Sequence, residues 1–133
     1  MRAAVIDTNV ISCKLKHHPI ADLYTSDLEN TQLLISFQTL AELEVWALEA
    51  DWGAKRSAAF RRELERLTVV YATAQTCQCF AAARVSAKRA GKSILAADAW
   101  VAAIALELGV PLVTHDPNNF AGVDKLEVIS HRG

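Results

Sequence analysis

Short apolar runs alternate along the chain with longer segments that repeat apolar residues every three or four positions. The short runs are typical of buried strands, and the longer segments are typical of amphipathic helices. We expect strands at residues 3–6, 32–36, 68–71, 111–114 and 126–130. We expect helices directly after Asp7 and over residues 19–28, 38–50, 54–67, 75–90 and 94–108.

Turn and cap residues separate these elements. Gly91 and Gly109 follow the last two predicted helices, where a glycine suits a helix C-terminus, and Trp52-Gly53 closes an earlier one. The alternation predicts an α/β fold, a three-layer α/β/α arrangement with a central, mostly parallel sheet of about five strands. Ligands of such sheets bind beyond the carboxyl ends of the strands, so functional residues are expected there.

Length and composition fit one globular domain spanning residues 1–133. The chain is 52% apolar and 22% charged, which argues against disorder. Its longest apolar run, residues 94–106, contains Asp98 and is shorter than the roughly 20 residues of a membrane span. The first residues lack the apolar core of a signal peptide, so we expect a cytoplasmic protein with no membrane partner.

The three cysteines do not indicate a metal or disulfide site. Their odd number and a reducing compartment argue for free thiols. Cys77 and Cys79 resemble half of a zinc site, but no second cysteine or histidine pair lies at ligand spacing. Packing within a helix is the better interpretation.

The net charge of −1 gives no global basic field for binding nucleic acid. The sequence contains 15 acidic and 14 basic residues. Four of the acidic residues are site candidates, and without them 11 acidic residues face the same 14 basic ones. If bound cations offset those four, the rest of the surface tolerates a polyanion.

Asp98 is the most informative of the four candidates. It is the one charged residue in residues 94–106, and its neighbours three and four positions away on the helix are all apolar. An ionised carboxylate without a partner in such surroundings costs several kcal/mol unless a counter-charge, a proton or a metal offsets it. A functional role is therefore favoured over a carboxylate that merely interacts with the amides of the helix N-terminus.

Position along the sheet singles out the other three candidates less strongly. Asp7 follows the first strand, where a helix cap explains it as well as a ligand does. Asp116 precedes a proline and also suits a turn. Glu42 shares its helix with Glu44 and Glu49, so an ordinary charged helix face is an alternative.

All four acids are expected near one edge of one sheet. Like charges gathered there repel each other and cannot all stay ionised unaided. Sets of oxygen ligands suit Mg²⁺ or Mn²⁺, whereas zinc favours histidine and cysteine. The sequence thus points to hard divalent cations.

Four short motifs contain these acids, namely Asp7-Thr8-Asn9, Ala41-Glu42-Leu43, Ala97-Asp98-Ala99 with the following Val101-Ala102-Ala103, and Thr114-His115-Asp116. In their order and spacing, over nearly the whole chain, these motifs resemble the PIN-domain family. The chain length and the T-x-D-x-x-x-F stretch from Thr114 to Phe120 are most similar to VapC-type toxins of toxin-antitoxin modules.

The resemblance implies a PIN-like nuclease domain that cleaves RNA phosphodiester bonds with Mg²⁺ or Mn²⁺. It makes Asp7, Glu42, Asp98 and Asp116 the catalytic and metal-binding set, with Asn9 and Thr114 as supporting polar groups. Asn119 is a third supporting residue and stands where many relatives carry an acid, so one firmly bound cation and a weaker second are expected. The resemblance also implies a homodimer and an antitoxin partner.

Basic residues that hold RNA are harder to identify. Lys88, Arg89 and Lys92 precede the Asp98 helix, and Lys14 and Lys16 follow the Asp7 turn. Phosphate contact and ordinary solvated surface explain them equally well.

Three other functions compete with a toxin ribonuclease. A haloacid-dehalogenase-like phosphatase usually needs a second aspartate two residues after the first, and this chain has Asn9 there. An inactive PIN-fold binding module is disfavoured by the intact set of four acids. A housekeeping RNA-processing PIN nuclease stays open.

Overall fold

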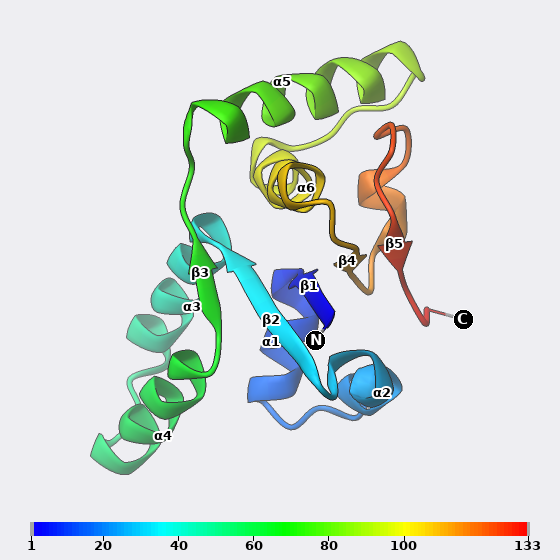
Figure 1. Ribbon diagram of the computed structural model, residues 1–133. Helices are drawn as coiled ribbons and strands as arrows, with labels where there is room; N and C mark the ends of the chain where they lie inside the picture. Colours follow the sequence, from blue (N-terminus) through cyan, green and yellow to red (C-terminus); the bar gives the residue numbers. More distant parts are fainter. Residues whose placement is uncertain (1, 133) are drawn as a thin grey trace.

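A computed structural model describes residues 2–132 and contains a five-stranded sheet (Figure 1). The strands lie in the order β3-β2-β1-β4-β5, and every neighbouring pair is parallel. The strand bounds are β1 Arg2–Ile6, β2 Thr31–Ser36, β3 Thr68–Val70, β4 Leu112–Val113 and β5 Val128–Ile129. The predicted α/β class is confirmed.

Helices and two 3₁₀ helices connect the strands. The α-helices are α1 Thr8–Leu15, α2 Thr25–Leu28, α3 Phe37–Ala50, α4 Ala54–Glu65, α5 Ala74–Arg89 and α6 Ala96–Leu108. The 3₁₀ helices are η1 Pro19–Tyr24 and η2 Pro117–Phe120.

Two apolar cores lie on opposite faces of the sheet and define the three layers. Alternate residues of a strand point to opposite faces. Val5 of β1 therefore packs with α5 and α6, whereas its neighbours Ala4 and Ile6 pack in the cluster that contains residues of α1, η1, α3 and α4. Figure 1 shows α5 and α6 together on one side of the strands.

Local structure changes two of the predicted helices and shows why a third one ends where expected. The helix expected over residues 19–28 is split into η1 and α2, because Tyr24 at the junction has φ −106° and ψ 2°, away from α-helical values. Helix α3 ends at Ala50, as expected, and the next residue, Asp51, adopts a left-handed conformation just before Trp52-Gly53. Helix α6 begins at Ala96, so Asp98 lies in its first turn.

Of the helices that residues 2–132 form, none has both the length and the apolar character needed to cross a membrane. Cys13, Cys77 and Cys79 are free thiols in this part of the chain.

The carboxyl ends of the strands meet at one edge, as in other parallel sheets. Asp7 follows β1, and residues 114–116 follow β4. The Asp7 N–H donates to the Val113 carbonyl at 2.9 Å, which binds these two chain segments at that edge. Residues 130–132 follow β5 at the same edge, so the fold brings together segments that lie far apart in the sequence.

Candidate active site

Asp7 is buried at the junction of β1 and α1, with only 6% of its surface exposed. One carboxylate oxygen caps α1 by accepting the Thr8 N–H at 2.9 Å. The other accepts the Thr114 hydroxyl at 2.7 Å. The cap and ligand interpretations of Asp7 are thus compatible, since a capping carboxylate also faces the site.

Burial raises the pKa of Asp7 from its ordinary value to about 6. The hydrogen bonds from Thr114 and Thr8 oppose this shift, and the negative charges of Asp98 and Glu42 add to it. Asp7 therefore carries a charge that its surroundings neutralise incompletely.

Thr114 links two of the predicted acids. Its fully buried hydroxyl donates to Asp7 and accepts the Asp116 N–H at 3.0 Å. Since both bonds use the same oxygen, the geometry of Asp7 and the backbone position of Asp116 depend on one side chain. This is the supporting place expected for Thr114.

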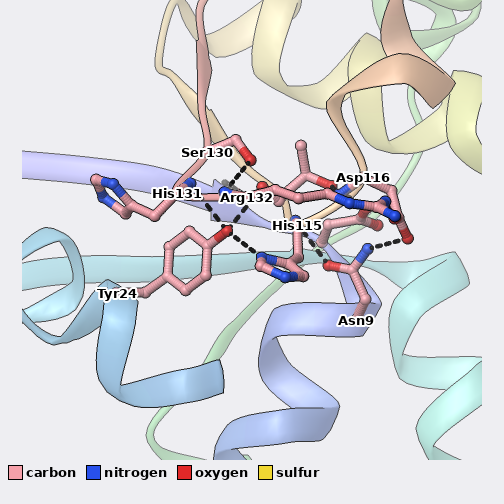
Figure 2. Close-up of polar contacts among 9 residues, drawn as sticks. Asn9, Tyr24, His115, Asp116, Ser130, His131 and Arg132 are labelled. Carbon is pink, nitrogen blue, oxygen red and sulfur yellow. Dashed lines mark hydrogen bonds and ion pairs between the residues drawn. The ribbon is translucent and has the colours of Figure 1, made fainter. Parts of the chain in front are cut away.

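Asp116 lies at the rim, and its two carboxylate oxygens have different partners (Figure 2). Oδ2 accepts the Asn9 side-chain amide at 3.0 Å, and Oδ1 forms an ion pair with Arg132 at 2.5 Å. The Asn9 carbonyl oxygen in turn accepts the His115 N–H at 3.2 Å. Asn9 therefore holds the turn after β4 as well as the carboxylate.

Asp98 enters the site from the first turn of α6, where the helix N-terminus favours a negative charge. Desolvation nevertheless raises the pKa of Asp98, and the charges of Glu42 and Asp116 raise it further. Glu42 and Asp98 also raise the pKa of Asp7, so the four predicted acids are close enough to affect one another electrostatically.

A pocket of about 310 Å³ gathers most of these groups. Asp7, Glu42 and Asp98 line it, together with Asn9 and Asn119. Glu42 accepts a hydrogen bond from Gln38 at 3.3 Å within α3. Glu44, an alternative on the same helix, instead pairs with Arg61 at 2.7 Å and belongs to the surface.

Asp7, Glu42 and Asp98 share this pocket, whereas Asp116 is not among the described residues that line it. In residues 2–132, no three acidic, histidine or cysteine side chains lie close enough to form a ready-made ligand set. Like charges in such a pocket repel each other. The donor chemistry fits a hard divalent cation, because carboxylate oxygens line the pocket and the amide oxygens of Asn9 and Asn119 lie beside them.

The structure does not bring the predicted RNA-binding residues into this pocket. Among the described residues, Lys14, Lys88, Arg89 and Lys92 are all absent from its lining. Arg89 lines a separate cavity of about 550 Å³ beside Gly109 and Asp124, and Lys14 lines another beside His18. Their contact with RNA stays a prediction.

Sequence reasoning missed a polar network beside Asp116 (Figure 2). The buried Tyr24 hydroxyl lies 2.6 Å from His115 Nδ1 and accepts the His131 N–H at 3.1 Å. Arg132 completes the network through its ion pair with Asp116. The available signal was the position of residues 130–132 after the last strand, at the edge where the acids were expected.

Known proteins with the same fold and motifs identify the class. The PIN domain family model matches residues 4–126. The chain belongs to the PIN-domain family.

Among characterised relatives, Ribonuclease VapC1 of Haemophilus influenzae strain R2866 is 31% identical over 125 residues, 92% of this chain and 93% of the relative. The solved structure of VapBC-1 from nontypeable Haemophilus influenzae has a TM-score of 0.79 at 30% identity and covers 96% of this chain and 97% of that one. A structure of VapBC2 from Rickettsia felis has a TM-score of 0.82 at 21% identity, covers 97% and 98% of the two chains, and supports the fold.

Proposed function

We propose that this protein is a divalent-cation-dependent endoribonuclease and the toxin of a toxin-antitoxin pair. The observation that carries the proposal is the pocket lined by Asp7, Glu42 and Asp98, with Asp116 close enough to raise the pKa of Asp98. The relative named Ribonuclease VapC1 supports the substrate class, and the likeness to VapBC-1 supports the toxin role.

Asp7, Glu42, Asp98 and Asp116 are the residues that would hold Mg²⁺ or Mn²⁺, with Asn119 beside them. A bound cation of this kind supplies Lewis acidity that activates water and offsets charge developing on the phosphate. The raised pKa values of Asp7 and Asp98 support this assignment, because desolvated carboxylates with acidic neighbours are stabilised in their charged form by a cation.

The chain's own residues prepare the pocket for that task. Thr114 fixes the Asp7 carboxylate, and Asn9 orients the Asp116 carboxylate. The first turn of α6 supplies Asp98 to the same pocket. Such supporting hydrogen bonds reduce the rearrangement needed when ligands gather around an ion.

The test is cleavage of a labelled single-stranded RNA by purified protein with Mg²⁺, with Mn²⁺ and with EDTA. We expect cleavage with either cation and none with EDTA. Asp98→Asn keeps the shape and removes the charge, so we expect a loss of more than about a hundredfold. Asp51→Asn, at an exposed position that also suits asparagine, is the matched control and should keep full activity. Equal cleavage by the wild type and Asp98→Asn would contradict the proposal.

The toxin role predicts a protein partner that silences the enzyme. We expect a short reading frame directly upstream to encode a small DNA-binding protein with a flexible tail. Co-expression should yield a stable complex in which RNA cleavage is suppressed. A protein that cleaves RNA but has no such partner would instead be a housekeeping RNA-processing nuclease.

A further inference from the structure

Two polar contacts hold the segment after β5 to other parts of the chain, and a third lies within the segment. The His131 N–H donates to the buried Tyr24 hydroxyl at 3.1 Å, and His131 Nε2 lies 2.6 Å from Asp27 Oδ2. The Arg132 N–H donates to the Ser130 hydroxyl at 3.3 Å. Figure 2 shows the contacts of the His131 and Arg132 N–H groups, and the Arg132 side chain runs toward Asp116. The position of this arginine is therefore defined by the fold.

Arg132 uses the carboxylate oxygen of Asp116 that Asn9 leaves open. With Asn9 on Oδ2 and Arg132 on Oδ1, both oxygens of Asp116 are engaged. The ion pair is exposed, with 56% of the Arg132 side chain and 41% of the Asp116 side chain accessible to solvent. Exposed ion pairs are weak and break readily. A divalent cation that needs Asp116 as a ligand therefore competes with Arg132 for the same oxygen.

An arginine released from Asp116 would stand at the rim of a strongly acidic pocket. Such a pocket repels an RNA backbone, whose binding depends on cations near its phosphates. A guanidinium group matches phosphate geometry with two parallel hydrogen bonds. Arg132 is paired with a predicted catalytic acid, whereas Lys14 and Arg89 line cavities elsewhere, so Arg132 is the best-placed of these cations.

We propose that Arg132 is a positioning residue that exchanges Asp116 for an RNA phosphate when a divalent cation binds to Asp116. The RNA step rests on the proposed ribonuclease function, whereas the competition for Asp116 does not. Arg132 lies outside residues 4–126, the part of the chain that matches the family model.

The first test measures Mn²⁺ binding without RNA, by the electron paramagnetic resonance signal of free Mn²⁺. Because Arg132→Gln removes the competing cation, we expect about three- to tenfold tighter Mn²⁺ binding than in the wild type. Arg132→Lys keeps the charge and should lie close to the wild type. Arg66→Gln, which removes an exposed arginine that lies 3.7 Å from Glu63, is the matched control and should leave the affinity unchanged. Equal affinity of Arg132→Gln and the wild type would overturn the exchange.

The second test measures cleavage of a fluorescein-labelled, mixed-sequence RNA of about 20 nucleotides at saturating Mn²⁺. We expect Arg132→Gln to raise KM about tenfold, with kcat changed less than about twofold, because it removes a contact to the substrate backbone. Arg132→Lys keeps the positive charge and should have a KM between those of the wild type and Arg132→Gln. An unchanged KM, or a loss confined to kcat, would overturn the positioning role.

The two tests separate the exchange from the ribonuclease proposal. Wild-type protein that cleaves no RNA contradicts the ribonuclease function, whereas the Mn²⁺ titration still decides whether Arg132 competes for Asp116. If Arg132 has only a structural role, Arg132→Gln should lower the urea midpoint of unfolding and leave Mn²⁺ affinity and KM unchanged. That result would also overturn the proposal.

Discussion

Asp7 and Asp116 follow neighbouring strands of the sheet, β1 and β4, yet their carboxylates have opposite surroundings. Asp7 is buried, accepts hydrogen bonds from a hydroxyl and a backbone amide, and has a raised pKa. Asp116 is half-buried, and one of its oxygens pairs with a full positive charge. One carboxylate is fixed and poorly neutralised, whereas the other is neutralised by a partner that can leave.

This difference shows how one edge of a sheet can hold several carboxylates while burying only some of them. Burying both acids without a cation would add a second desolvation cost to that of Asp7. Leaving Asp116 at the rim lets Arg132 act as its counter-ion. The asymmetry predicts that substitutions on the Asp7 side affect stability strongly, and that substitutions on the Asp116 side affect ion binding more.

The largest effect is expected for Asp7→Asn, which should change activity and stability in opposite directions. Activity should fall by more than about a hundredfold, because a ligand charge is lost. The protein should unfold less readily at pH 7.5, by about 1–3 kcal/mol, because the buried charge is removed while the shape is retained. RNA cleavage and urea unfolding measure the two effects.

The stability gain should depend on pH, since the folded protein holds the Asp7 proton up to a pKa of about 6, above the unfolded value of 3.8. The native state then binds more protons than the unfolded state between these values, so wild-type stability falls as the pH rises through them. The advantage of Asp7→Asn should therefore be small near pH 4 and full above pH 7. An advantage of the same size at both ends would show that the charge is not its cause.

Thr114→Val tests the link between the two acids. The buried hydroxyl would be lost from its bonds to Asp7 and to the Asp116 N–H, and both groups would lose a partner. We expect a cost of about 2 kcal/mol in the free energy of unfolding. Thr114→Ser should recover part of it. Thr68→Val, at an exposed position in β3, is the control and should change stability by less than about 0.5 kcal/mol.

Tyr24→Phe tests the anchor of the segment that carries Arg132. The His131 N–H would lose its acceptor while the aromatic ring stays packed. We expect a loss of about 1 kcal/mol in stability and faster amide hydrogen exchange at His131 and Arg132. Tyr71→Phe, in which the ring is 65% exposed, is the control and should show neither change. Unchanged exchange in Tyr24→Phe would mean that other contacts hold the segment.

The fold could be predicted from the sequence because each layer leaves a periodic signal. Strand β2 reads as an apolar run, and α3 repeats its apolar residues at helical spacing. The division between η1 and α2 at Tyr24 has no such signal in the sequence, because Tyr24 fits the apolar spacing of a continuous helix. Its hydroxyl instead serves partners 90 and 107 residues away, and such distant partners cannot be predicted from local periodicity.

The candidate site could be predicted in part for the same reason. Asp98 stood out as a charge among apolar residues, and Asp7 stood out at the end of a strand. The sequence could not decide between Glu42 and Glu44. The tertiary structure decides it, because the packing of α4 against α3 places Arg61 beside Glu44. Arg132 was missed since a lone arginine after a short strand has the pattern of a solvated surface residue.

The smallest effect is expected for Asn119→Asp, which tests whether a further carboxylate in the pocket strengthens cation binding. Asn119 lines the acidic pocket next to Asp98, whereas its exposed neighbour Asn118 does not, among the residues described for that pocket. An added carboxylate at position 119 supplies another oxygen ligand with charge, so we expect Mn²⁺ affinity to rise about threefold. Asn118→Asp adds the same charge outside the pocket and should change the affinity by less than about 1.5-fold, through long-range attraction alone. Equal effects of the two substitutions would mean that net charge, rather than a ligand in the pocket, controls cation binding at this edge.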